Sequence, residues 1–190
     1  QALINSYYKI ISYLKEKIMY EYKCKIVKIV DGDTVDVDLD LGFGIWLRDE
    51  RVRLNGIDTP ESRTSDKVEK VFGMAAKDRL NSLLGGEAIL LSQVTKGGEN
   101  MKGKFGRILG NFRTLDGKNV SDVLQEEGHA VAYQGGNKDE VQAKHLINRQ
   151  RLINEDKVPT PEGMVKTKGA YNEFKATKPP LKKKKNKKKK

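Results

Sequence analysis

Alternating apolar and polar residues predict β-structure in the first third of the chain. Residues 22–31 form one predicted strand, and the segment after it alternates apolar side chains with aspartates: Val35, Asp36, Val37, Asp38, Leu39, Asp40 and Leu41. This period of two is typical of a strand with one face in the core and one face in water. A glycine-containing connection over 42–46 leads to a third predicted strand over 47–57. Two more strands are predicted over 87–94 and 107–114.

Apolar residues at helical spacing predict three helices. The clearest helix carries its apolar residues at intervals of three and four, namely Val68, Val71, Phe72, Ala75, Ala76, Leu80 and Leu83. The pair Gly85–Gly86 predicts its end. A short helix is expected after Asp116–Gly117, ending near Gly128. The third begins at Asn137, where Glu140 completes a pair that resembles a capping box.

Five strands and three helices without regular βαβ alternation predict a mainly β fold with attached helices, in the α+β class. A small closed barrel fits this order of elements. We expect the folded domain to span residues 21–155. Residues 1–20 are expected to be an N-terminal helical extension, because the apolar residues within 3–18 share one stripe. Residues 156–190 are expected to be a polar, Lys-rich and disordered C-terminal tail.

The basic charge of the chain is concentrated at its C-terminal end. The formal net charge is +11, and the last 13 residues carry nine lysines and no acid. Without that segment the net charge is only +2, so the predicted domain itself is nearly balanced. A flexible run of lysines favours capture of a polyanion such as nucleic acid rather than a role in the fold.

Cysteine content and hydropathy bear on disulfide formation, membrane insertion and cellular location. Cys24 is the single cysteine, so no internal disulfide can form. No stretch approaches the 18 or more apolar residues of a membrane span, and no signal peptide is evident. These features slightly favour a cytoplasmic location for what we expect to be a monomer. Secretion stays open, because Gln1 is not an initiator residue.

Two short segments carry a candidate catalytic chemistry. One is Asp31-Gly32-Asp33-Thr34, and the other runs from Arg53 to Glu61 and contains Asp58. The three carboxylates of Asp33, Asp58 and Glu61 can hold a hard divalent cation and activate a water molecule. Arg53 can clamp a phosphate, and Arg107 at the start of another predicted strand can bring a second guanidinium to it. The set predicts a metal-dependent nuclease.

These motifs resemble those of the staphylococcal nuclease (thermonuclease) family, over roughly residues 22–150. The shared patterns are Asp-Gly-Asp-Thr, then Arg-x4-Asp-Thr-Pro-Glu, then an aromatic residue followed by Gly-Arg, all in the family's order. The resemblance implies a five-stranded barrel of the oligonucleotide-binding (OB-fold) type. It also implies a calcium-dependent endonuclease that acts on DNA and RNA and leaves a 3′-phosphate.

The resemblance also implies the roles of individual residues. Asp33, Asp58 and the carbonyl of Thr59 would bind Ca2+. Arg53, Glu61 and Arg107 would be the catalytic residues, with Glu61 as the expected general base.

Other polar residues have simpler interpretations. Asp36, Asp38 and Asp40 are expected to line one solvated strand face. His129 and His145 have no partner at metal-ligand or triad spacing, so both are expected to be ordinary helix-end or surface residues.

A non-catalytic nucleic-acid-binding barrel is the alternative function. Joint retention of Arg53, Glu61 and Arg107 favours the enzyme, because a binding module needs cations but no carboxylate facing the phosphate.

Overall fold

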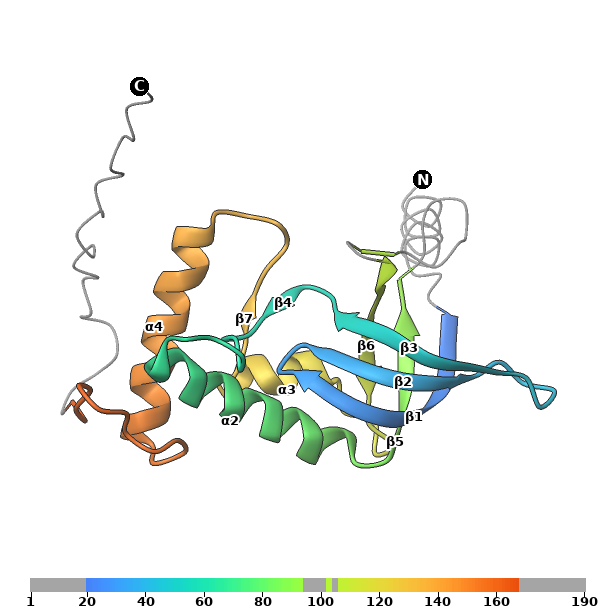
Figure 1. Cartoon of the computed structure of the whole chain (residues 1–190), viewed down its shortest axis with the longest axis horizontal. Helices are drawn as coiled ribbons and strands as arrows, with labels where there is room; N and C mark the ends of the chain where they lie inside the picture. The colour runs from blue at the N-terminus through green and yellow to red at the C-terminus, as the bar shows by residue number, and fades with distance from the viewer. Residues whose placement is uncertain (1–19, 94–101, 104–105, 168–190) are drawn as a thin grey trace, which may run out of the picture.

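A computed structural model describes residues 20–93, 102–103 and 106–167 and shows a closed five-stranded barrel with helices packed beside it (Figure 1). The barrel strands are β1 (Tyr20–Asp31), β2 (Thr34–Asp40), β3 (Trp46–Leu54), β5 (Glu87–Ser92) and β6 (Ile108–Arg113). Their order around the barrel is β1-β2-β3-β6-β5, and β1 closes it by pairing with β5. The β3–β6 pair is parallel and the other pairs are antiparallel. The predicted α+β class and OB-type barrel are confirmed.

Strand β2 shows how the alternating sequence pattern builds the barrel wall. Val35, Val37 and Leu39 are almost fully buried in the core. The aspartates between them face outward, where Asp36 accepts two hydrogen bonds from Arg51 and Asp38 accepts one from Arg48 on β3. The predicted wet face is therefore a row of cross-strand ion pairs, which is the arrangement that stabilises neighbouring strands.

The third predicted strand is divided by a turn. The sequence pattern suggests one strand over 47–57, whereas β3 ends at Leu54 and a second short strand, β4, covers Ile57–Asp58. Gly56 has a φ of 79°, a conformation that glycine adopts without steric cost. After this turn, β4 pairs with β7 (Val131–Ala132) and not with the barrel. Asp58 is thus fixed through its backbone to Val131, far along the chain.

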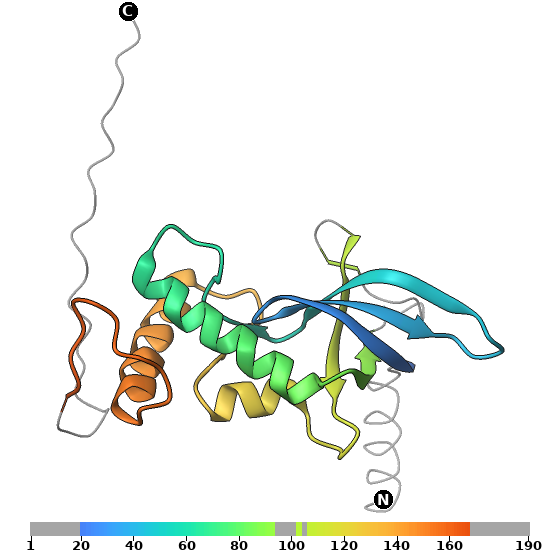
Figure 2. The same ribbon diagram turned by 60° about the horizontal axis from the view of Figure 1, so that its bottom comes forward.

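Three helices occupy the described residues, as predicted. They are α2 (Lys67–Leu84), α3 (Val120–Glu126) and α4 (Lys138–Asn154). Asp66 caps α2 by accepting from the amides of Val68 and Glu69, and Asn137 caps α4. Figures 1 and 2 show α2 and α3 side by side against the barrel. None of the helices in the described part of the chain is long and apolar enough to cross a membrane.

Ordered packing continues beyond α4. Val158 is 3% exposed and lies in a cluster with Phe72, Leu152 and Ile153. The amide of Gln150 on α4 also donates to the carbonyl of Val165. The described chain therefore extends past residue 155, where the sequence pattern placed the domain boundary. The predicted helix over 3–18 and the lysine-rich segment 178–190 lie outside the described residues.

A close contact between α2 and the chain at Glu61 fixes the position of that residue. Gly73 is buried on α2, and a Cβ atom placed there would lie 2.4 Å from both the carbonyl carbon and the carbonyl oxygen of Glu61. No side chain fits in that space. The helix is therefore pressed directly against the backbone that carries a predicted catalytic residue.

We predict that Gly73→Ala destabilises the protein. Alanine in a helix interior normally favours folding by up to about 1 kcal/mol over glycine, but forced overpacking typically costs about 1–3 kcal/mol. Urea denaturation measures the net effect. Gly86→Ala is the matched control, since a Cβ at Gly86 meets no atom within 4 Å. Equal stability of the two variants would contradict the close packing of α2 on Glu61.

Candidate active site

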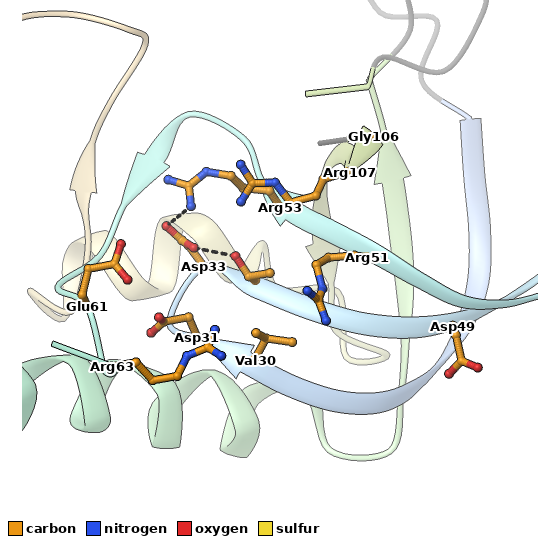
Figure 3. Close-up of a pocket in the computed structure, with 11 residues that line it drawn as sticks. Val30, Asp31, Asp33, Asp49, Arg51, Arg53, Glu61, Arg63, Gly106 and Arg107 are labelled. Carbon is orange, nitrogen blue, oxygen red and sulfur yellow. Dashed lines mark hydrogen bonds and ion pairs between the residues drawn. The ribbon is translucent and has the colours of Figure 1, made fainter. Parts of the chain in front are cut away.

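The predicted catalytic residues line one pocket at the side of the barrel. The pocket has a volume of about 450 Å3 and is walled by the β1–β2 turn, β3, the segment after β4 and the residues before β6 (Figure 3). Its charged lining residues are Asp31, Asp33, Asp49, Arg51, Arg53, Glu61, Arg63 and Arg107. Arg53, Glu61 and Arg107, which are far apart in the sequence, are therefore brought together by the fold.

The β1–β2 turn is held close to the segment that follows β4. At Gly32, a Cβ would lie 2.8 Å from Oγ1 of Thr59 and 2.9 Å from Cβ of Ala76, so only glycine allows this approach. Asp31 accepts hydrogen bonds from the amides of Gly32 (2.9 Å) and Ser62 (3.2 Å). These contacts place Asp33 and Glu61 on neighbouring walls of the pocket.

Arg53 lies at the centre of the charged groups. Its Nη1 is 2.7 Å from Oδ2 of Asp33, and its Nη2 is 3.6 Å from Oδ1 of Asp58. Thr34 donates a 2.8 Å hydrogen bond to the other oxygen of Asp33. Thr34 and Arg53 are themselves register partners on β2 and β3. The guanidinium therefore lies between two carboxylates, one from the β1–β2 turn and one from β4.

Two carboxylates that line this pocket, Asp33 and Glu61, have raised pKa values. Burial raises the pKa of Asp33, Arg53 acts in the opposite direction, and the charges of Asp58 and Asp31 raise it further. Burial also raises the pKa of Glu61, and Asp31 adds to the rise through its charge and a hydrogen bond. Asp33 contributes as well, while Arg53 opposes the shift. Burial is thus the main cause of both rises, and the neighbouring carboxylates add to it.

The donor chemistry at Asp33 and Asp58 fits a hard cation such as Ca2+, since both side chains offer carboxylate oxygens as ligands. No group of three or more carboxylate, histidine or cysteine side chains forms a ready-made ligand set among the described residues. Ca2+ also accepts backbone carbonyls and waters as ligands, so two carboxylates suffice to start a site. Thr59 is buried beside Gly32. Asp58 lines an adjoining pocket together with Arg53 and Arg107.

His145 is a site residue that the sequence analysis missed. It is 4% exposed, and its Nε2 lies 2.9 Å from Oδ2 of Asp58. The expectation of an ordinary helix-end or surface residue is therefore wrong for His145. His129 follows the end of α3, but it is buried rather than on the surface. The missed signal is the spacing on α4, where His145 shares the buried stripe of Arg149, Leu152 and Ile153.

The amino-acid sequence matches one known protein family over most of the residues that the structure describes. Residues 51–159, more than half of the sequence, match the family described as "Staphylococcal nuclease homologue". This match runs from β3 to just beyond α4 and includes Arg53, Asp58, Glu61 and Arg107. The chain therefore belongs to the staphylococcal nuclease family, as its motifs predict.

Curated relatives agree with this placement. The chain is 29% identical over 117 residues to an "Uncharacterized endonuclease" of Escherichia coli, covering 62% of this chain and 65% of that protein. It is 30% identical over 119 residues to "Endonuclease YhcR" of Bacillus subtilis (strain 168), covering 60% of this chain and 9% of that protein. It is 32% identical over 107 residues to the "Thermonuclease" of Staphylococcus intermedius, covering 56% of this chain and 57% of that protein. The matches thus span less than two thirds of each relative.

We predict that His145 and Asp58 are energetically coupled. His145→Leu removes the hydrogen-bonding ring, and Asp58→Ala removes its acceptor. Because the two side chains touch, the effects of the two changes on the free energy of unfolding should deviate from additivity by about 0.5–3 kcal/mol. Urea denaturation of both single variants and the double variant measures this. His129→Leu, which removes a buried histidine without this hydrogen bond, should combine with Asp58→Ala more nearly additively. Additive effects for His145 would refute the contact.

Proposed function

We propose that this chain is a calcium-dependent nuclease that hydrolyses phosphodiester bonds of DNA and RNA. The observation that carries the proposal is the shared pocket of Arg53, Glu61 and Arg107, in which two guanidinium groups and one carboxylate line the same space. The names of the relatives, endonuclease and thermonuclease, support the same activity.

The acidic half of the pocket favours an enzyme over a non-catalytic nucleic-acid-binding module. A surface that only binds phosphates gains from cations, whereas each carboxylate repels the ligand. Asp31, Asp33 and Glu61 nevertheless line this pocket. Burial and neighbouring carboxylates raise the pKa values of Asp33 and Glu61, so ionising these two groups in the folded protein lowers its stability. Such a cost is typical of catalytic groups.

The two arginines would act on the charge that develops during the reaction. As hydroxide attacks a phosphodiester, negative charge grows on the phosphoryl oxygens that do not leave. Arg53 can donate to one of these oxygens while Asp33 holds its guanidinium in place at 2.7 Å. Arg107 would donate from the position just before β6, the strand that runs parallel to β3. An arginine that acts on the transition state of phosphoryl transfer contributes about 10³- to 10⁵-fold in turnover.

Glu61 would accept the proton of the attacking water. Burial and the neighbouring Asp31 raise its pKa, which brings this carboxylate closer to the range in which a general base works best. When bound at Asp33 and Asp58, Ca2+ would supply a Lewis acid that neutralises charge on the phosphate and orients the water. The chain's own residues then supply the proton acceptor, the phosphate clamp and the walls of the site.

We predict that Glu61→Gln abolishes most turnover and at the same time stabilises the fold. Loss of a general base should reduce turnover by at least about 100-fold. Because the pKa of Glu61 is raised on folding, the folded protein holds its proton to a higher pH than the unfolded chain does. Stability therefore falls as pH rises from the unfolded pKa through the folded pKa. Without calcium, the neutral glutamine should make the variant more stable at neutral pH.

Asp49→Asn is the matched control for this experiment. Asp49 lines the same pocket, so the change removes the same charge from its wall, and asparagine tolerates the positive φ of 56° at this position. Cleavage kinetics and thermal unfolding at pH 5 and pH 7 measure both effects. Near-normal turnover of Glu61→Gln would remove Glu61 from the mechanism, and an equal loss in Asp49→Asn would show that only total charge matters.

A further inference from the structure

The candidate active site contains more arginines than the attacked phosphate requires. Four guanidinium groups line the pocket, and the proposed mechanism uses those of Arg53 and Arg107. Those two line the same two adjoining pockets, and Figure 3 shows them on one side of the site, whereas Arg51 and Arg63 lie on either side of Val30. The pocket therefore has a second pair of cations, separate from the first, whose function the reaction itself does not explain.

Arg51 has a fixed orientation and a solvent-exposed guanidinium. Its Nε and Nη2 donate to the two oxygens of Asp36, at 2.7 Å and 2.9 Å. Such a two-point pair orients the guanidinium plane and leaves three of its five N–H groups for another acceptor. The Arg51 side chain is still 52% exposed. Asp36 thus pre-organises this arginine without covering it.

Arg63 is close to the reacting groups and has no partner among the residues that the structure describes. It follows Ser62, which is buried and whose amide donates to Asp31. Glu61, on the other side of Ser62, is held by the contact of its backbone with Gly73. The backbone beneath Arg63 is therefore anchored, while its exposed side chain lines the pocket. An unpaired cation on an anchored backbone is suited to an anionic ligand.

We propose that Arg51 and Arg63 bind a second phosphate of the substrate, adjacent to the phosphate that is cleaved. This inference rests on the proposed nuclease function and narrows its substrate class to polynucleotides with phosphates on both sides of the reacting nucleotide. Guanidinium groups suit this function, because they donate to phosphate oxygens through two parallel hydrogen bonds. Binding of this second phosphate would hold the polynucleotide so that the phosphate to be cleaved lies beside Glu61 and Arg53.

The test compares substrates with one and with many phosphates. Arg63→Gln is the sharper variant, because Arg51→Gln would also leave Asp36 without its partner. Cleavage of a dinucleotide with a single phosphodiester and of a long single-stranded oligonucleotide should be measured with calcium. We expect kcat/KM for the oligonucleotide to fall about tenfold more than that for the dinucleotide, as fits the loss of one charged hydrogen bond. The salt dependence of log affinity should lose a slope of about 0.7.

Lys70→Gln is the control for unspecific electrostatics. Lys70 is exposed on α2 and is absent from the lining of the pocket, so its loss removes one positive charge without touching the site. Equal losses on both substrates, or an oligonucleotide effect no larger than that of Lys70→Gln, would overturn the second phosphate position and leave the nuclease proposal intact. If the unaltered protein cleaves neither substrate, the nuclease proposal fails. Fluorescence anisotropy would then test phosphate binding by Arg63 separately from cleavage. Weaker oligonucleotide binding by Arg63→Gln than by Lys70→Gln would support it, and equal binding would overturn it.

Discussion

The ion pair between Arg53 and Asp33 is the contact on which the site depends. It joins the C-terminal end of β3 to the β1–β2 turn at 2.7 Å, and the same guanidinium lies 3.6 Å from Asp58. Asp33 is almost completely buried, and a buried carboxylate without a partner would strongly oppose folding. The pair therefore serves the fold and the proposed chemistry together. Arg53 opposes the rise that burial causes in the pKa of Asp33, and Asp33 in turn fixes the guanidinium at the proposed phosphate position.

Each side chain around this pair is held by an element distant in sequence. The turn at Gly32 packs on Thr59 and α2, Gly73 presses α2 against Glu61, and β7 pairs with Asp58. From α4, His145 provides a second hold on that aspartate. A catalytic group must be placed within a fraction of an ångström, and rigid elements achieve this better than loops do. Both glycines occur where a side chain would push the site apart.

The sequence predicted most of this arrangement, because the barrel and the motifs leave local signals. Alternation in β2, helical spacing in α2 and the caps at Asp66 and Asn137 are short-range features, and the residues Arg53, Glu61 and Arg107 lie in short motifs. The missed features depend on contacts between distant segments. The pairing of β4 with β7, the hydrogen bond between His145 and Asp58 and the packing of Val158 in one cluster with Phe72 arise from tertiary structure. A lone histidine on a helix has no periodic signal that identifies its partner 87 residues away.

Digestion of nucleic acid by the purified protein, with calcium and with excess calcium chelator, tests the central claim most directly. The proposed site predicts cleavage of DNA in Ca2+ and loss of cleavage in chelator. Without a bound cation, the carboxylates of Asp33 and Asp58 would repel the negatively charged phosphate of the substrate. Mg2+ should support less activity, since it requires stricter octahedral geometry and releases its waters reluctantly. Full activity in excess chelator would contradict the calcium site, and the absence of any cleavage in Ca2+ would contradict the nuclease itself.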